Sequence, residues 1–215
     1  MSRVNENNFD FYNKIGVPTF ENLAQQGGFD SYVDLQNAYR YIQPNEIVLE
    51  IGAGYGRCID FLLYKEHKGT IYAIEQSGSL CEHLREKYRD KANIIEGDIY
   101  QSYLPERVDS ALWMWSGIID FAAEEQAHTI QHLADLLKEK GKLFIDIPRL
   151  GTQTIAIHQD NQRIKMKTDF GEMECYIPTT VEVQEYAHQA GFTRVDEINY
   201  ETATAKKRTM YILLK

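Results

Sequence analysis

The sequence predicts an α/β fold built from parallel βαβ units. Short apolar runs with the length of buried strands alternate with longer amphipathic segments about every twenty to thirty residues. The first of these runs, IVLEIGAG from Ile47, is continuously apolar or β-branched and closes with glycines, as is typical of a strand buried on both faces. A chain of 215 residues with 43% hydrophobic residues is long enough for one domain with a sizeable core.

The N-terminal segment, residues 1–46, has little strand character. Tyr32, Leu35 and Tyr39 recur at helical spacing, which predicts a helix that ends at Pro44. We therefore expect a helical segment over 1–46 that acts as a lid, followed by the main domain over 47–215.

Within the main domain, the strands and helices are expected in strict alternation. After the strand at Ile47, a helix is predicted over about 56–64, and another long helix from Glu124 with Gly141 as the first residue beyond it. The remaining predicted elements are strands from Thr70, Asn93, Val108 and Lys142 and a helix from Ser79.

The alternation changes after Pro148. Residues 161–178 form two alternating runs about a DFG turn, which predicts a hairpin within an insertion at about 151–178. A helix from Thr179 follows, and then two strands, RVDEINYE and RTMYILLK, whose short link implies antiparallel pairing.

Charge and composition exclude several classes of protein. The net charge of −9 repels polyphosphate, so nucleic acid is disfavoured as a partner. The three cysteines, Cys58, Cys81 and Cys175, are too few and too scattered for a disulfide framework, which indicates a reducing compartment. They also form no C-x-x-C pair that would suggest zinc or redox chemistry. No segment resembles a signal peptide or a membrane span, so we expect a cytoplasmic protein without membrane contact.

The segment Glu50 to Gly56 joins a buried strand to a helix through three glycines. Glycines let a ligand approach the backbone, and the helix N-terminus supplies free N–H donors. The alternative interpretation of the glycines is a tight turn without a ligand. NAD-binding loops follow G-x-G-x-x-G, whereas Arg57 stands where the third glycine would be. Glu75 and Asp98 end the next two strands, and a carboxylate such as Glu75 can accept hydrogen bonds from both hydroxyls of a ribose.

Five segments in order resemble class I S-adenosylmethionine-dependent methyltransferases: LEIGAGYGR, IYAIEQS, EGDIY, VDSALWMWSGIIDF and GKLFIDIP. The resemblance covers roughly residues 45–150 and the last two strands. It implies a Rossmann-like, doubly wound sheet of seven strands in the order 3-2-1-4-5-7-6, with strand 7 antiparallel. The cofactor S-adenosylmethionine, which leaves as S-adenosylhomocysteine, would lie at the carboxyl edge of strands 1, 2 and 4.

The resemblance also implies the cofactor-binding residues. The methionine portion would contact strand 1 and its loop, at Glu50, Gly52, Ala53, Gly54, Gly56 and Arg57. The ribose would bind at the end of strand 2, at Glu75 and Gln76, and the adenine at the end of strand 3, at Asp98 and Ile99. The transferring end would lie beside Met114 and Trp115, after strand 4. Arg57 and Arg40 are candidates for the cofactor carboxylate, with solvated side chains as the alternative. An acidic rim suits a cationic sulfonium.

The sequence assigns no catalytic residue and no metal site. Methyl transfer needs alignment and exclusion of water more than a dedicated base. His128 and His132 stand four residues apart but lack the Glu of H-E-x-x-H. Asp120 and Asp146 lie near the expected site and would either touch the acceptor or satisfy backbone donors.

The acceptor is expected to be a small molecule methylated on N or O. The loop MWSGIIDF lacks the N-P-P-Y turn of enzymes that act on base amines, and the hairpin resembles the roof found in the small-molecule branch. Tyr12, Tyr32, Tyr39 and Tyr41 would either form an aromatic lid or simply pack in the core.

Several alternatives remain beside a monomeric or homodimeric small-molecule enzyme. They are an RNA or protein acceptor, served by Arg40, Arg149 and Lys206; a non-catalytic cofactor-binding module; and a nucleotide-dependent oxidoreductase. The cluster Lys206 to Arg208 is otherwise expected to be a solvated hairpin tip.

Overall fold

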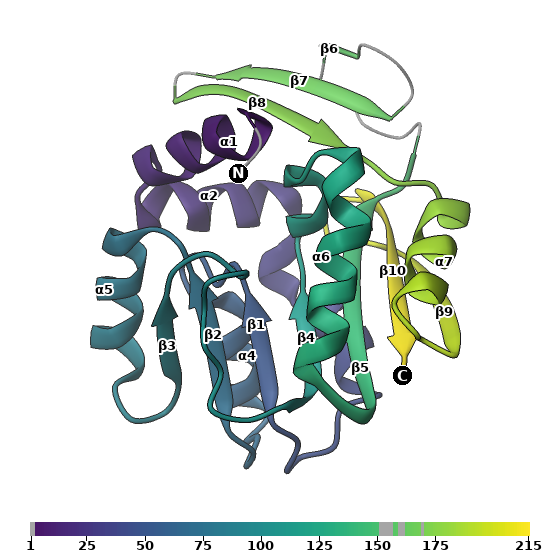
Figure 1. Ribbon diagram of the computed structural model, residues 1–215. Coiled ribbons are helices and arrows are strands. Elements are labelled where there is room, and N and C mark those ends of the chain that lie inside the picture. Colours follow the sequence, from purple (N-terminus) through teal and green to yellow (C-terminus); the bar gives the residue numbers. More distant parts are fainter. Residues whose placement is uncertain (1–2, 151–156, 159–161, 169) are drawn as a thin grey trace.

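A seven-stranded sheet forms the centre of the computed structural model, which describes residues 3–150, 157–158, 162–168 and 170–215 (Figure 1). Its order is β3-β2-β1-β4-β5-β10-β9. The first five strands are parallel, and β10 is antiparallel to both of its neighbours. The predicted strand order and the antiparallel last strand are confirmed. The strands are β1 Val48–Ile51, β2 Ile71–Glu75, β3 Asn93–Glu96, β4 Val108–Trp113, β5 Leu137–Pro148, β9 Arg194–Glu201 and β10 Lys207–Leu214.

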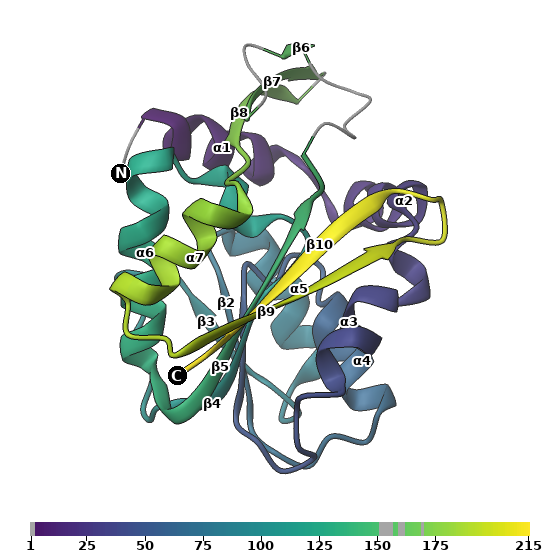
Figure 2. The same ribbon diagram turned by 90° about the vertical axis from the view of Figure 1, so that its right-hand side faces the viewer.

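Helices cover both faces of the sheet, as Figures 1 and 2 show. On one face lie α3 (Val33–Tyr39), α4 (Arg57–Tyr64) and α5 (Gly78–Tyr88), and on the other α6 (Ala123–Leu136) and α7 (Thr180–Gln189). Successive strand residues serve opposite faces: Val48 packs in the cluster with α3, α4 and α5, and Leu49 in the cluster with α6 and α7. Two buried layers explain the continuous apolar runs in the sequence.

The predicted end of the long helix is wrong. We expected it to end just before Gly141 and the next strand to begin at Lys142, but α6 ends at Leu136 and β5 begins at Leu137. Leu137 pairs with Val108 across the sheet, and the register then shifts before Lys142. Lys140 has a φ of 64° in this irregular stretch. Burial of Leu137 against the neighbouring strand therefore overrides a local sequence that suits a helix.

A second, smaller assembly lies above the carboxyl ends of the parallel strands (Figure 1). The predicted hairpin is confirmed by antiparallel pairing of β7 (Arg163–Thr168) with β8 (Gly171–Tyr176). A short strand, β6 (Ile157–His158), joins its edge, while the rest of the predicted insertion at 151–156, 159–161 and 169 lies outside the described residues. Helix α1 (Arg3–Lys14) packs on β8, and α2 (Val17–Gly27) continues towards η1 (Phe29–Ser31).

Gly56 gives a test of how tightly the first loop is packed. It caps α4 with a φ of 92°, and an added Cβ would lie 2.3 Å from the hydroxyl of Tyr88. We expect Gly56→Ala to lower the free energy of unfolding in urea by roughly 3 kcal/mol or more, because a clash adds to the strain of a left-handed residue.

The control is Gly191→Ala. Gly191 has a φ of 82°, but within the described part of the chain no atom beyond its neighbours lies within 4 Å of an added Cβ. That variant carries only the strain of about 1–2 kcal/mol. Equal losses in the two variants would contradict the packing argument.

Candidate functional site

The glycine loop after β1 leaves room beside its backbone. Gly52 and Gly54 have φ values of 68° and 57°, which glycine adopts without strain. Among the described residues, no atom beyond the chain neighbours lies within 4 Å of a Cβ added at either position. The loop is therefore a cradle in which a ligand can touch the main chain, and Gly56 ends it by capping α4.

Glu50 lies on β1 beside this cradle. The residue is 4% exposed, and its Oε2 has no hydrogen-bond partner among the described residues. Burial raises the pKa of the Glu50 carboxyl to about 8, against the opposing influence of Cys58 and Arg57. Buried polar atoms are nearly always partnered, so this oxygen is suited to a donor that the protein itself does not supply.

Glu75 ties the end of β2 to the glycine loop. Its Oε2 accepts a hydrogen bond from the Gly54 amide at 2.8 Å, and its Oε1 accepts one from the Ser77 amide at 2.8 Å. Burial raises the pKa of Glu75, and these N–H donors oppose the rise. Each carboxylate oxygen keeps a second lone pair, so the anchored side chain can still accept hydrogen bonds from a diol. Gln76, the next residue, is half-buried.

The turn after β3 is held by its own residues and by α6. Asp98 Oδ1 accepts a hydrogen bond from the Tyr100 amide at 2.8 Å. The buried Ile99 has its carbonyl 3.1 Å from His132 Nε2, and the ring of His128 stacks on Tyr100. The two histidines thus brace this turn. Within the described residues, no three His, Cys, Asp or Glu side chains gather where they could hold a metal ion.

The loop after β4 has an unusual backbone. Trp115 and Ser116 are consecutive non-glycine residues with φ values of 49° and 73°. Such a conformation persists only where neighbours hold it, and the Ser116 amide donates to the Asp146 carbonyl at 2.8 Å. Met114 is buried and Trp115 is half-buried at the same loop. The loop is therefore fixed beside the carboxyl edge of the sheet.

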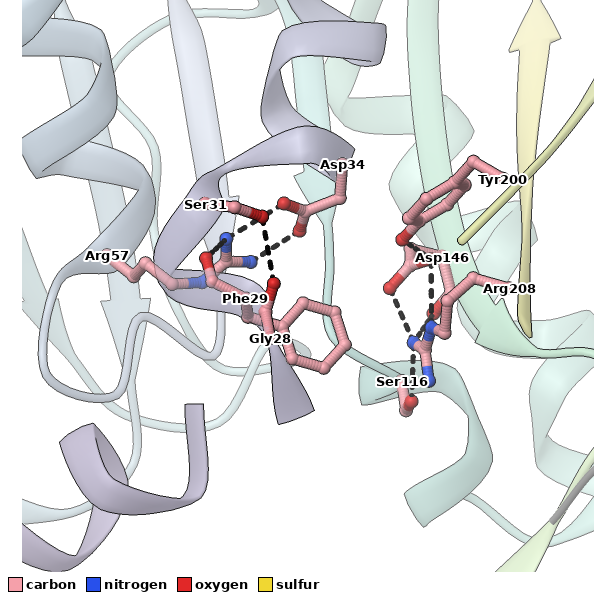
Figure 3. Close-up of polar contacts among 9 residues, drawn as sticks. All are labelled: Gly28, Phe29, Ser31, Asp34, Arg57, Ser116, Asp146, Tyr200 and Arg208. Carbon is pink, nitrogen blue, oxygen red and sulfur yellow. Dashed lines mark hydrogen bonds and ion pairs between the residues drawn. The ribbon is translucent and has the colours of Figure 1, made fainter. Parts of the chain in front are cut away.

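Two buried ion pairs flank the ring of Phe29 (Figure 3). The Arg57 guanidinium binds both oxygens of Asp34, at 2.9 and 2.5 Å, and donates to the Phe29 carbonyl at 3.3 Å. Although burial opposes it, the Asp34 carboxylate raises the pKa of Arg57. The guanidinium of Arg57, predicted to be near the cofactor carboxylate, is committed to Asp34.

The second pair joins Arg208 on β10 to Asp146 on β5. Arg208 donates to Asp146 Oδ2 at 2.5 Å and to Ser116 Oγ at 2.8 Å, while the Tyr200 hydroxyl donates to Asp146 Oδ1 at 2.5 Å. The prediction that Arg208 belongs to a solvated tip is wrong. Its side chain is 7% exposed because β10 begins at Lys207, which places the next residue inside the sheet. Both oxygens of the Asp146 carboxylate are therefore occupied, one by Tyr200 and one by Arg208.

Phe29 connects the two pairs. The guanidinium carbons of Arg57 and Arg208 lie 5.3 and 5.1 Å from the centre of its ring, and Trp115 packs against it at 5.2 Å between ring centres. The segment that precedes the sheet in sequence is therefore bound to α4 and β10 by two cation–π contacts and to the loop after β4 by one ring contact.

Asp120 ends η2 (Gly117–Asp120) beneath α1 and β8. Its Oδ2 accepts a hydrogen bond from the Tyr12 hydroxyl at 2.9 Å, and its Oδ1 lies 3.8 Å from the Cys175 thiol. Asn8 links the two elements by donating to the carbonyls of Asp120 and Glu174. Enclosure of the Asp120 carboxyl raises its pKa to about 7, although the residue as a whole is partly exposed.

Tyr12 lies close to the predicted cofactor site. Burial raises the pKa of its phenol, and the charges of Asp120, Cys175 and Glu75 add to the rise. Its ring stacks on Phe20. Phe20 in turn meets Tyr55 of the glycine loop and Trp115, with ring centres 6.5 and 6.3 Å apart. Sequence reasoning named Tyr12 among four candidate lid residues but gave no sign of its partner.

The other three tyrosines pack elsewhere. Tyr32 and Tyr39 contact Phe61 on α4, and Tyr41 contacts Phe144 on β5. These three tyrosines pack against the core on the α3 and α4 side of the sheet, as expected if they are packing residues and not part of a lid. Arg40 is exposed at the end of α3.

Comparison with known proteins identifies the domain. Residues 48–141 match a family model described as a methyltransferase domain. These residues include β1 with its glycine loop, β2, which ends at Glu75, and the turns after β3 and β4 that carry Asp98 and Trp115. With the sheet order above, the match shows a methyltransferase domain over residues 48–141 with the sheet topology of the class I S-adenosylmethionine-dependent methyltransferases.

Two curated relatives align with part of the chain. An uncharacterised methyltransferase of Geobacillus sp. (strain WCH70) is 31% identical over 115 residues, which are 54% of this chain and 53% of that protein. A fibrillarin-like rRNA/tRNA 2'-O-methyltransferase of Archaeoglobus fulgidus is 32% identical over 114 residues, 48% of this chain and 50% of that protein. The chain thus spans about half the length of these relatives.

Solved structures share the fold over almost the whole chain. One is the 1,6-didemethyltoxoflavin-N1-methyltransferase of Burkholderia thailandensis with bound 1,6-didemethyltoxoflavin and S-adenosylhomocysteine. It has a TM-score of 0.67 at 15% identity and covers 100% of this chain and 91% of that one. Another is an amino pentose methyltransferase of Micromonospora echinaspora bound to S-adenosylmethionine, with a TM-score of 0.64 at 12% identity, covering 90% and 96%.

None of the described helices combines the length and the apolar character needed to cross a membrane.

The buried pair of Arg57 and Asp34 can be tested by removing one charge. Asp34→Asn leaves the Arg57 guanidinium buried without a counter-charge, and we expect unfolding in urea to show a loss of about 3–5 kcal/mol. The exposed pair of Arg85 and Glu96 is the control, since Glu96→Gln should cost less than about 1 kcal/mol.

A double variant separates the pair from the packing around it. Asp34→Leu with Arg57→Met removes both charges and keeps apolar volume, so it should be more stable than Asp34→Asn alone. If the double variant loses as much stability as Asp34→Leu and Arg57→Met lose together, the two side chains do not depend on each other.

Proposed function

We propose that this chain transfers the methyl group of S-adenosylmethionine to a nitrogen or oxygen atom of a small-molecule acceptor. The observation that carries the proposal is the unpartnered, buried oxygen of Glu50 beside an open glycine cradle. The cofactor carries an ammonium group and a sulfonium, and both suit a site rimmed by carboxyl groups.

The residues present fit the cofactor. Glu50 would receive the amino group of its methionine portion, and the backbone of Gly52, Ala53 and Gly54 would line that portion. Glu75 would accept hydrogen bonds from the ribose hydroxyls, with Gln76 beside it. At the adenine end the candidates are Asp98 and Ile99, and at the transferring end Met114 and Trp115. Arg57 would act by holding the loop segment in place through Asp34 rather than by touching the cofactor.

When bound, the cofactor supplies a methyl group on a positively charged sulfur, which a nucleophile displaces in line. The chain itself aligns the acceptor and excludes water. The rings of Tyr12, Phe20, Tyr55 and Trp115 form a continuous aromatic wall beside the cradle. Such a wall excludes water and interacts favourably with a cation.

An RNA acceptor is the second candidate, favoured by the relative from A. fulgidus. The net charge of −9 works against it, and Arg57 and Arg208 are both neutralised by aspartates. The named small-molecule enzymes with the same fold favour a small acceptor. A third possibility, a module that binds the cofactor without turnover, predicts cofactor binding and no methylated product.

The cofactor assignment predicts a thermal shift with S-adenosylhomocysteine. At 100 times its Kd the ligand stabilises the folded state by about 2.7 kcal/mol, which is roughly 5–10 °C for a domain of this size. Glu75→Gln should abolish most of the shift because it removes an acceptor of the diol. NAD should give no shift, and a shift with NAD alone would overturn the assignment.

Gly54→Ala refines this test. The added methyl group would enter the cradle, so the shift with S-adenosylhomocysteine should disappear while the protein stays folded. Gly191→Ala is the matched control, because it places the same left-handed strain far from the cradle and should keep the full shift.

Cofactor binding should also release a proton. The raised pKa of Glu50, about 8, means that its carboxyl is mostly protonated at pH 7 in the free protein. An ammonium group beside its unpartnered oxygen favours the ionised form. Calorimetric titration with S-adenosylhomocysteine at pH 7 should therefore show up to one proton released, seen as an enthalpy that differs between phosphate and Tris buffers.

The sign of the pH effect follows from the same shift. A carboxyl whose pKa is raised on folding contributes stability at low pH and loses it as pH rises towards 8, so apoprotein stability falls over this range while cofactor affinity rises. Glu50→Gln should remove the buffer dependence. A buffer dependence that persists in this variant would assign the proton to another group.

A further inference from the structure

The carboxyl of Asp120 stands at the junction of three elements that are distant in sequence. It ends η2, in the loop that begins after β4, and it contacts Tyr12 on α1 and Cys175 on β8. Tyr12 links it through the ring of Phe20 to Trp115 and to the glycine loop. Two aromatic side chains, Tyr12 and Phe20, therefore connect Asp120 to the predicted transfer site.

The side chains that contact the Asp120 carboxyl are neutral, so this carboxyl is the acidic group of the cluster. Burial is the largest cause that raises the pKa of both the Tyr12 phenol and the Cys175 thiol, so both are neutral donors towards it. Asn8 is neutral, and Glu174 offers its backbone carbonyl to Asn8. None of these contacts brings a positive side chain to Asp120.

Two cations close to this region, Arg57 and Arg208, are already neutralised. Arg57 is bound by Asp34 and Arg208 by Asp146, each with an exposed fraction of 7% or less. The surroundings of the transfer site thus combine carboxyl groups with aromatic rings. This combination attracts a cation and repels an acceptor that carries phosphate or carboxylate.

We propose that Asp120, oriented by Tyr12, binds the acceptor as a protonated amine and takes up its proton, so that the enzyme is an N-methyltransferase for basic amines. The inference rests on the proposed function and narrows its acceptor from N or O to a basic nitrogen. Asp120 is then a catalytic residue and Tyr12 a positioning residue.

An acceptor ammonium passes one proton to a carboxylate oxygen of Asp120, and its nitrogen lone pair becomes free. That lone pair forms the new N–C bond while the methyl carbon's bond to sulfur breaks, both electrons of the broken bond remaining on sulfur. The products are a methylated ammonium, the neutral thioether and one proton, which leaves Asp120 for solvent.

The proton-accepting role sets the pH dependence. Asp120, with a pKa of about 7, becomes ionised between pH 6 and 8, whereas alkyl amines stay protonated over this range. Amine binding should therefore strengthen from pH 6 to 8. The Tyr12 hydroxyl donates to the carboxylate and lowers its pKa, so Tyr12→Phe should move the midpoint of this rise to higher pH.

The test compares matched probes on the protein loaded with S-adenosylhomocysteine. Benzylamine and cyclohexylamine are paired with benzyl alcohol and cyclohexanol, and the melting temperature is recorded from pH 6 to 8. We expect the amines to add stabilisation that the alcohols do not, and Asp120→Asn to abolish the difference. Asp135→Asn on α6, an exposed carboxyl, is the control and should leave it unchanged.

The two proposals fail in different ways. If the wild-type protein shows no thermal shift with S-adenosylhomocysteine, the proposed function itself is overturned. With that shift intact, equal responses to amines and alcohols, or an amine response that persists in Asp120→Asn, would overturn the inference. Retention of the S-adenosylhomocysteine shift in Asp120→Asn shows that this variant is folded.

A second readout identifies the methylated atom. Incubation of a metabolite extract with S-adenosylmethionine carrying a trideuterated methyl group, followed by mass spectrometry, should place the label on nitrogen in the wild type and give at least a tenfold lower yield in Asp120→Asn. A label on oxygen would overturn the inference.

Discussion

The structure depends on the two buried ion pairs that enclose the ring of Phe29. Arg57 belongs to the helix after the glycine loop, whereas Arg208 belongs to the last strand, and neither is close to Phe29 in sequence. Each guanidinium is desolvated, so each needs its aspartate nearby. The N-terminal segment, the glycine loop and the loop after β4 are thereby fixed to one another, and the candidate site lies among them.

This constraint also determines the electrostatics of the site. The two arginines are neutralised within their own pairs. The carboxyls of Glu50 and Glu75 lie beside the cradle, and the carboxyl of Asp120 is connected to it through the rings of Tyr12 and Phe20. Burial raises the pKa of all three carboxyls, which favours their neutral form while the site is empty. A positive ligand then favours their ionised form. A cationic cofactor and a basic acceptor fit the same physical environment.

Local patterns failed where tertiary contacts compete with them. Residues 137–140 suit a helix, yet Leu137 gains more by pairing with Val108 in the sheet. Arg208 resembles part of a solvated basic turn until its strand is placed beside Asp146. In both cases the deciding energy comes from a partner distant in sequence, which no local window contains.

The sequence by itself determined the alternation of strands and helices, the strand order implied by the family resemblance, and the residues at the strand ends that form the cradle. The alternation follows from periodicity, and the cradle follows from glycines whose backbone conformation other residues rarely adopt. Only the tertiary structure decided that Arg57 is held by Asp34, that Tyr12 meets Asp120, and that Tyr32, Tyr39 and Tyr41 pack behind the sheet. The reason is that burial and charge pairing depend on which elements lie together after folding.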